Sequence, residues 1–162
     1  MVRNEKRAKH MGVTERIRLL IDQSTDWVAA MATMVYELHS AFDYYHWTGF
    51  YGTIRPDWLQ VGPYQGGSGC IDIPFANGVC GAAARKKKTQ LVPDVTQFPG
   101  HIDCSPDTRS EIVIPIVSWG VGTVAVLDVD SNHASAFDTV DQEYLEAICD
   151  EMVVSWANQF SF

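Results

Sequence analysis

The chain has 162 residues, 46% of them hydrophobic, and a formal net charge of −8 at pH 7. This length is typical of one domain that can bury a sufficient core without a disulfide or a metal. The acidic balance argues against a nucleic-acid partner, which usually needs a basic surface, and no apolar run approaches the ~20 residues of a membrane span.

Residues 1–13 are predicted to form a disordered tail, because the first ten are mostly polar and basic and chain termini often fray. They lack the apolar core of a secretory signal, so we expect a cytoplasmic protein with one folded domain over 14–162. Cysteines in that reducing compartment are more often catalytic, redox-sensing or metal-binding than structural.

Long helices are predicted near both ends of the chain. Apolar residues recur at helical spacing over 14–42, with a break near 23–25 and with Thr14 as N-cap. The same periodicity returns over 137–160. We expect these terminal helices to pack together on one face of a sheet.

Short β-type runs separate the two helical regions. The aromatic and β-branched segments 45–54 and 58–64 flank an Arg-Pro-Asp turn, which predicts a hairpin. A second hairpin is predicted from 111–119 and 121–130 around Gly120. Between the hairpins we expect a strand at 70–73, a helix at 78–88, a strand at 89–93 and a long loop at 94–109. This order predicts an α+β domain with a mostly antiparallel sheet.

Three of the four cysteines lie in turn-rich stretches rather than in apolar runs. They are Cys70, Cys80 and Cys104. Because a core cysteine normally behaves as a small hydrophobe, these three are candidates for attack on an oxidisable group followed by disulfide exchange. Cys104 is the strongest candidate nucleophile; a cationic His101 would lower its pKa, whereas Asp103 would raise it.

Either of the other two cysteines is a candidate to resolve an oxidised Cys104. Cys80 is expected in the first helical turn, where the helix dipole favours a thiolate, and Cys70 follows a flexible Gly-Gly-Ser-Gly run. The alternatives are inert thiols or a zinc site, but the chain has no Cys-x2-Cys pair of the kind typical of structural zinc. We therefore expect no metal. Cys149 lies beside the apolar stripe of the C-terminal helix and is expected in the core.

Three carboxylates form a second group of candidates. Asp128 and Asp130 are two apart on a predicted strand and share a face, and Glu111 begins the partner strand of the same hairpin. Three carboxyl groups in one pocket cannot all ionise cheaply, so at least one pKa should rise. A carboxyl group that keeps its proton near neutral pH can act as a general acid. The alternative is that these residues only solvate the end of a strand.

Two aromatic residues share one face of the first predicted strand. Trp47 and Tyr51 are four positions apart. They would form an aromatic wall suited to a small apolar group such as an S-methyl. Core packing alone is the alternative explanation.

Six motifs in order along the chain resemble those of the GAF-domain free methionine-(R)-sulfoxide reductases, over roughly residues 25–155. They are Trp47-Thr-Gly-Phe-Tyr51, Gly62-Pro-Tyr-Gln-Gly66, Gly78-Val-Cys-Gly81, Phe98-Pro-Gly-His-Ile-Asp-Cys104, Ser110-Glu-Ile-Val113 and Leu127-Asp-Val-Asp-Ser131. The resemblance implies a GAF-like fold and an enzyme without a cofactor. It also implies the usual homodimer of that family.

The implied reaction is reduction of free L-methionine-(R)-sulfoxide to methionine, with electrons from a thioredoxin-type protein. The resemblance assigns Cys104 as the nucleophile that becomes a sulfenic acid. Cys70 would then form a disulfide with it, and Cys80 would be a second or alternative resolving thiol.

The resemblance also assigns the substrate pocket. Glu111, Asp128 and Asp130 would hold and protonate the sulfoxide oxygen, while Trp47 and Tyr51 would enclose the methyl group. The loop at 94–109 is expected to close over the pocket as a lid.

Two rival functions remain at this level. A non-catalytic GAF-type sensor would bind a small ligand and use its thiols as a redox switch, but would not need the three carboxylates together. A purely structural partner protein would not depend on Cys104.

Overall fold

The computed structural model describes residues 2–21 and 26–156. Its elements are α1 (Arg3–Leu20), α2 (Trp27–Ala41), β1 (Trp47–Arg55), β2 (Trp58–Gly66), β3 (Asp72–Pro74), α3 (Gly78–Lys86), β4 (Gln90–Val92), the 3-10 helix η1 (Val95–Gln97), β5 (Ser110–Ser118), β6 (Gly122–Ser131) and α4 (Thr139–Trp156). Within the described residues, no helix is both long enough and apolar enough to cross a membrane.

One six-stranded sheet organises the chain. Its strand order is β3-β2-β1-β6-β5-β4, and every neighbouring pair is antiparallel. Both predicted hairpins are confirmed as β1–β2 and β5–β6, and pairing of β1 with β6 joins them into one sheet. The expected α+β class with an antiparallel sheet is therefore confirmed.

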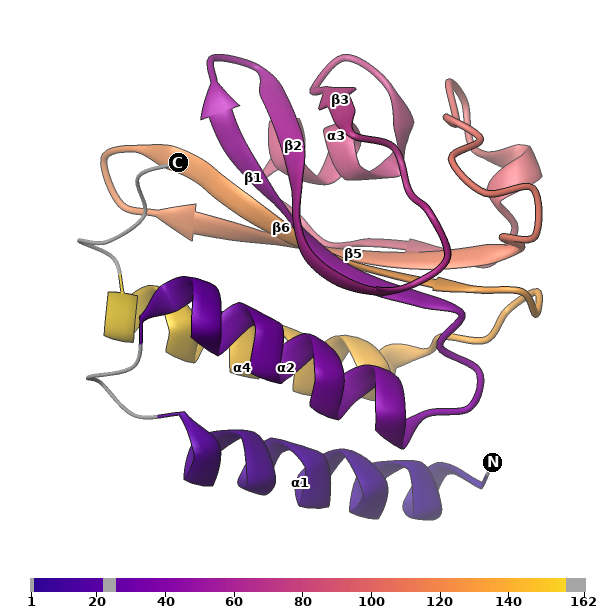
Figure 1. Ribbon diagram of the computed structural model, residues 1–162. Coiled ribbons are helices and arrows are strands. Elements are labelled where there is room, and N and C mark those ends of the chain that lie inside the picture. The colour runs from indigo at the N-terminus through magenta and orange to yellow at the C-terminus, as the bar shows by residue number, and fades with distance from the viewer. Residues whose placement is uncertain (1, 22–25, 157–162) are drawn as a thin grey trace.

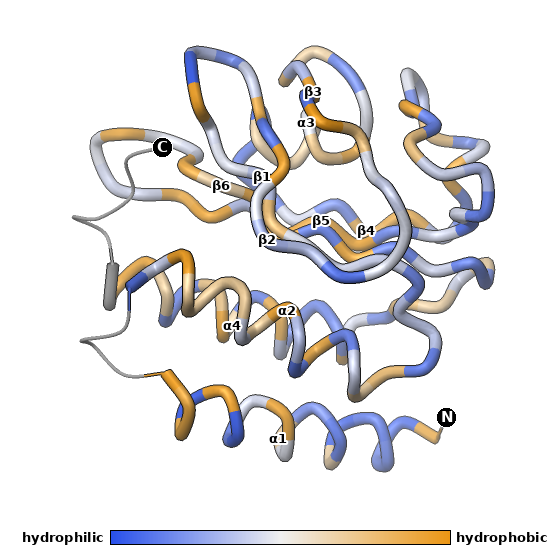
Figure 2. The backbone as a smooth tube through the Cα atoms, viewed as in Figure 1, coloured by the Kyte–Doolittle hydropathy of each residue, from blue (hydrophilic) through white to orange (hydrophobic). Residues whose placement is uncertain are grey.

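Helices cover the two faces of the sheet unequally. Figure 1 shows α2 and α4 beneath one face, with α1 on their outer side, while α3 lies on the opposite face. The N- and C-terminal helices thus share one face, as the sequence predicts. Figure 2 shows apolar stretches in the central strands β5 and β6, which lie between these two layers.

The period-two alternation of the strands divides the interior into two clusters. On β5, Ile112 and Ile114 face the layer of α2 and α4, whereas Val113 packs with residues of α3 on the other side. On β6, Leu127 belongs to the first cluster and Val126 to the second. This alternation sends Glu111 and Asp128 toward α3, where the candidate site lies.

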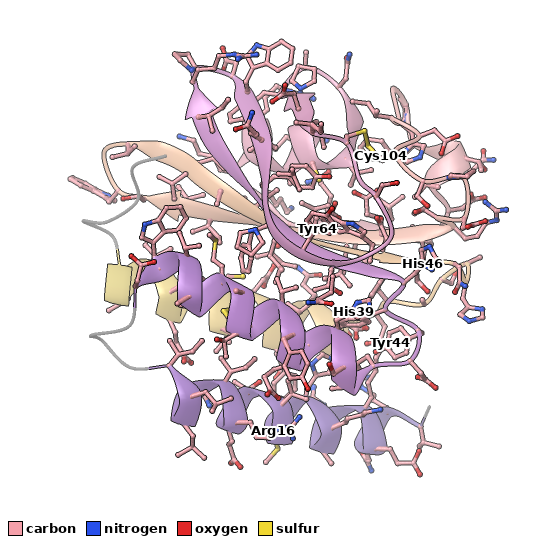
Figure 3. The ribbon with its side chains drawn as sticks, in the orientation of Figure 1. Arg16, His39, Tyr44, His46, Tyr64 and Cys104 are labelled. Atoms are coloured by element: carbon pink, nitrogen blue, oxygen red, sulfur yellow. A yellow bond between two sulfur atoms is a disulfide. The ribbon has the colours of Figure 1, made fainter. Side chains whose placement is uncertain are left out.

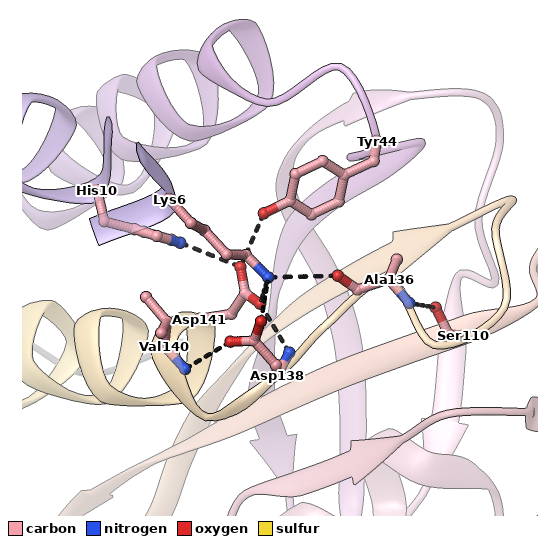
Figure 4. Close-up of polar contacts among 8 residues, drawn as sticks. All are labelled: Lys6, His10, Tyr44, Ser110, Ala136, Asp138, Val140 and Asp141. Carbon is pink, nitrogen blue, oxygen red and sulfur yellow. Dashed lines mark hydrogen bonds and ion pairs between the residues drawn. The ribbon is translucent and has the colours of Figure 1, made fainter. Parts of the chain in front are cut away.

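The N-terminal segment is the main correction to the sequence-based expectations. The expected disordered tail is wrong for residues 3–13, because α1 begins at Arg3 and buries Lys6 and His10. Both side chains contact Asp141 at the start of α4, with His10 Nε2 3.0 Å from its Oδ1 (Figure 4). Thr14 is not an N-cap but lies within α1, where its hydroxyl donates to the His10 carbonyl at 2.8 Å. Polar partners distant in the sequence thus order a segment that looks solvated in isolation.

Smaller differences concern element ends. The predicted break at 23–25 and the end of the predicted helix at 157–160 lie outside the described residues. Helix α2 is capped by Asp26, whose side chain accepts from the Val28 amide at 2.9 Å. Helix α3 ends at Lys86, because Lys87 adopts the left-handed conformation.

Candidate active site

A small cavity of about 30 Å³ lies between α3, the α3-facing side of β1, β5 and β6, and two loops. The loops precede β3 and β5, and a disulfide between Cys70 and Cys104 joins them, with 5.1 Å between the two Cα atoms (Figure 3). Cys104 lines the cavity and both cysteines are half-buried. The pair that the resemblance implied is therefore formed here.

The long loop is also tied to the start of α3. The Gly78 amide donates to the Gly100 carbonyl at 2.8 Å, and Gly78 takes a positive φ of 71° that glycine tolerates readily. A Cβ atom on Gly81 would lie 2.5 Å from the Pro74 carbonyl oxygen, so glycine lets α3 approach β3 closely. These contacts bring the N-terminal turn of α3 against the cavity.

Cys80 is the free thiol of the cavity. It is 3% exposed, and its Sγ atom lies 3.9 Å from Oε1 of Glu111. Burial, reinforced by the negative charges of Asp128 and Glu111, raises the pKa of this thiol well above its usual value. The expected helix-dipole thiolate at Cys80 is therefore wrong in this state, because desolvation outweighs the dipole.

All three predicted carboxylates meet in this cavity. Glu111 on β5 pairs with Asp130 on β6, and Asp128 lies two positions before Asp130 on the same strand. Glu111 and Asp128 are each only 5% exposed, and Asp130 is half-buried. This burial excludes the alternative in which they merely solvate a strand end.

The electrostatics of the cluster favour proton uptake. Burial raises the pKa of Asp128 to about 7, against the lowering effect of hydrogen bonds from Cys80 and Glu111. Burial, then repulsion by Asp128, raises the pKa values of Glu111 and Asp130 well above the usual range. At neutral pH the cavity therefore holds carboxyl groups that keep their protons, as the sequence predicts.

The aromatic wall is present and has a third member. The rings of Trp47 and Tyr51 stack with centroids 5.6 Å apart, and Tyr64 of β2 stacks on Trp47 at 5.4 Å. Sequence reasoning missed Tyr64, although the hairpin register that places it opposite Gly49 was the available signal. Glycine at position 49 makes room for the stacking of Trp47 and Tyr64, since a Cβ there would lie 2.5 Å from an atom of each.

The loops add residues that the sequence analysis did not select. Ser68, Ile102, Ser105 and Thr108 line the cavity. His101 lines it too, and its Nδ1 atom is buried without a hydrogen-bond partner among the described residues. The loop positions of the first four residues carry no periodic signal, so only the tertiary structure assigns them to the cavity, whereas His101 is already a candidate from its closeness to Cys104 in the sequence.

Cys149 is buried between the helices and the sheet, as predicted. In the described part of the chain, one group of side chains has the spacing of a metal site, formed by Cys80, Glu111 and Asp128, whose ligand atoms all lie within 4.8 Å of one another.

Comparison with known proteins agrees with this geometry. The GAF domain family model matches residues 16–155. The free methionine-R-sulfoxide reductase of Neisseria meningitidis, solved in complex with its substrate, superposes with a TM-score of 0.89 at 40% identity, covering 94% of this chain and 90% of that one.

Two relatives of known sequence carry the same name. The Escherichia coli free methionine-R-sulfoxide reductase is 35% identical over 129 residues, which are 80% of this chain and 77% of that protein. The Saccharomyces cerevisiae free methionine-R-sulfoxide reductase is 48% identical over 105 residues, which are 64% of this chain and 58% of the yeast protein. The fold and the site thus define a GAF domain. Within that class, the chain belongs to the family of free methionine-R-sulfoxide reductases.

Proposed function

We propose that this protein reduces free L-methionine-(R)-sulfoxide to L-methionine through a cysteine sulfenic acid and an intramolecular disulfide. One observation carries the proposal: a disulfide between Cys70 and Cys104 lies at a cavity in which three carboxyl groups with raised pKa values converge. Thiol chemistry and proton donation are the two requirements of sulfoxide reduction.

In the proposed first step, the Cys104 thiolate attacks the sulfur of the sulfoxide. The sulfoxide oxygen becomes a leaving group only after it accepts protons, which carboxyl groups of Glu111, Asp128 and Asp130 supply. The protonated oxygen departs as water and leaves a sulfur–sulfur bond between Cys104 and the substrate. A water molecule then attacks the Cys104 sulfur, methionine departs with the electron pair of that bond, and Cys104 becomes a sulfenic acid.

In the second step, the Cys70 thiol attacks the sulfur of the sulfenic acid. Water leaves, and the Cys70–Cys104 disulfide forms, which is the pairing found in this structure. A thioredoxin-type dithiol then reduces the disulfide and returns both thiols. Cys80 remains a candidate for an alternative disulfide, because it is free and lines the same cavity.

The size of the cavity supports a role for the loop at 94–109 as a lid. A volume of about 30 Å³ accommodates little more than one or two water molecules, which is far less than an amino acid. We infer that substrate binds after reduction of the disulfide lets this loop separate from Cys70. Trp47 and Tyr51 would then enclose the methyl group, and closure of the loop would exclude sulfoxides within polypeptides. A homodimer, as is usual in the family, is part of the same proposal.

The test is an assay of the purified protein with the R and S epimers of free methionine sulfoxide, each with dithiothreitol. We expect methionine from the R epimer alone, and none from the same sulfoxide within a peptide. Binding of the R epimer without any methionine formed would favour the non-catalytic GAF-type sensor.

A further inference from the structure

Cys80, Glu111 and Asp128 form a compact set of donors whose chemistry is not limited to proton transfer. The three side chains are 3%, 5% and 5% exposed. Their ligand atoms all lie within 4.8 Å of one another, and Cys80 Sγ is 3.9 Å from Glu111 Oε1. Helix α3 supplies the sulfur, and adjacent strands β5 and β6 supply the oxygens.

A second observation is that one carboxylate oxygen of this cluster lacks a hydrogen bond. The Oδ1 atom of Asp128 is buried and has no hydrogen-bond partner among residues 2–21 and 26–156. No lysine or arginine is among the described residues that line the cavity. A buried carboxyl oxygen without a partner is costly, and a cation bound beside it would remove that cost.

We propose that these three residues bind one zinc-class divalent cation. Zinc takes sulfur at about 2.3 Å and carboxylate oxygen at about 2.0–2.2 Å, so a tetrahedral site places sulfur and oxygen roughly 3.5 Å apart. The observed 3.9 Å between Cys80 Sγ and Glu111 Oε1 requires an approach of a few tenths of an ångström for that pair. The three ligand atoms all lie within 4.8 Å of one another, so a side-chain adjustment of about 1 Å brings the full set into range. The cavity has room for the ion and for one water molecule as the fourth ligand.

The donor set also determines which cations are excluded. Magnesium and calcium require six or more oxygen ligands, and a thiolate with two carboxylates favours softer ions such as zinc. Binding involves no oxidation: the Cys80 thiol, and any protonated carboxyl group, releases its proton to solvent as the metal–ligand bond forms.

The consequence for catalysis rests on the proposed function. A cation held by Glu111 and Asp128 would occupy the carboxyl groups that the sulfoxide oxygen needs. Zinc should then inhibit turnover in competition with the sulfoxide, and the site would sense metal excess.

The decisive experiment uses the oxidised protein, in which the disulfide removes Cys70 and Cys104 as ligands and leaves Cys80 and Cys149 free. Co²⁺ serves as a spectroscopic probe of a zinc site, because a sulfur-to-cobalt absorption band reports a thiolate ligand. We expect this band in the wild type and in Cys149→Ser, its loss in Cys80→Ser, and its displacement by Zn²⁺ but not by Mg²⁺.

Two results would overturn the inference: no sulfur-to-cobalt band in the oxidised wild type at excess Co²⁺, or an unchanged band in Cys80→Ser. Asp128→Asn provides a second variant that keeps the thiol, and it should require a higher Co²⁺ concentration to reach the same band. Because the oxidised protein turns over no substrate, this binding assay and the methionine assay fail independently of each other.

Discussion

Glu111 on β5 lies directly opposite Asp130 on β6, so two acidic residues occupy neighbouring positions on the cavity side of the sheet. Like charges in this arrangement destabilise a sheet unless a proton is shared between them. The register of this hairpin therefore adds to the raised pKa of Glu111, for which burial is the largest cause and the charge of Asp128 the next.

The first prediction concerns the pH dependence of turnover. The pKa of Asp128 is raised to about 7 by burial, and in the proposed mechanism Asp128 is one of the carboxyl groups that must donate a proton before the sulfoxide oxygen can leave. We therefore expect a descending limb in the pH profile of kcat/KM above about pH 7, with a loss of about tenfold per pH unit once one required proton is gone. Steady-state kinetics between pH 5.5 and 9 measures it, and a rate that only rises over this range would contradict the role of the cluster as proton donor.

The second prediction separates catalysis from stability at the same residue. Between the unfolded pKa near 3.8 and the folded value of about 7, the folded state binds the extra proton. The free energy of unfolding therefore falls as pH rises through this window, by at most about 1.4 kcal/mol per pH unit. Asp128→Asn removes this loss, so the Tm of the variant relative to wild type should increase from pH 5 to pH 8, while its activity drops sharply. If Asp128→Asn instead lowered the Tm at pH 8 and its loss of activity could be explained by unfolding, Asp128 would be a structural residue.

The third prediction assigns the two disulfide cysteines. Cys104→Ser should abolish turnover with the fold intact, whereas Cys70→Ser should allow about one turnover and then stall when a thioredoxin-type protein is the reductant. Rapid-quench measurement of methionine per enzyme distinguishes the two variants. Cys149→Ser is the matched control, since Cys149 lies in the other core cluster, and it should turn over normally. Normal steady-state rates in Cys70→Ser would move the resolving role to Cys80.

The fourth prediction concerns the polar cluster that holds α1. Asp141 is fully buried and accepts hydrogen bonds from Lys6, His10 and Tyr44, the last at 2.9 Å (Figure 4). Burial alone would raise the pKa of Asp141, but the bonds from His10 and Lys6 outweigh it and lower the pKa. The ionised Asp141 therefore stabilises the folded state fully above its pKa in the unfolded chain, near 3.8. This stabilisation is lost as the pH falls through the lower pKa that Asp141 has in the folded state.

Asp141→Asn should therefore cost about 3 kcal/mol of unfolding free energy at pH 7, because Lys6 would keep a buried charge with only the exposed carboxylate of Asp138 as an ionic partner. Chemical denaturation measures this cost. Glu143→Gln is the control: it breaks an exposed ion pair with Arg7 and should change stability by less than about 1 kcal/mol. Similar small effects in both variants would show that α1 does not depend on the buried cluster.

The fifth prediction tests the aromatic wall through a glycine. In Gly49→Ala the new Cβ would lie 2.5 Å from both Trp47 and Tyr64, so Trp47 must shift. We expect a higher KM for the sulfoxide with a smaller change in kcat, since an enclosing wall contributes to binding. Gly67→Ala is the matched control, because its Cβ would meet no atom within 4 Å. An equal rise in KM in Gly67→Ala would show that the rise in Gly49→Ala is not caused by displacement of Trp47.

Much of the site follows from local patterns in the sequence. The period of two along a strand places Asp128 with Asp130, and Trp47 with Tyr51, on one face. Turn-rich surroundings distinguish three of the cysteines from Cys149. These signals suffice for the fold class and for the strand residues of the pocket, because they depend on residues only a few positions apart.

Only the tertiary structure decided the rest. The residues alone left open whether Cys70 or Cys80 pairs with Cys104, and the fold answers by bringing together loops that are 34 residues apart. It also keeps the Cys80 thiol neutral, adds Tyr64 to the aromatic wall, and orders α1 through Asp141. Desolvation and long-range pairing depend on groups that are distant in the chain, whereas alternation along a strand depends only on neighbouring residues. The sequence therefore determined which strand residues face the cavity, and the fold determined the loop residues that join them, the charge of each group and its partners.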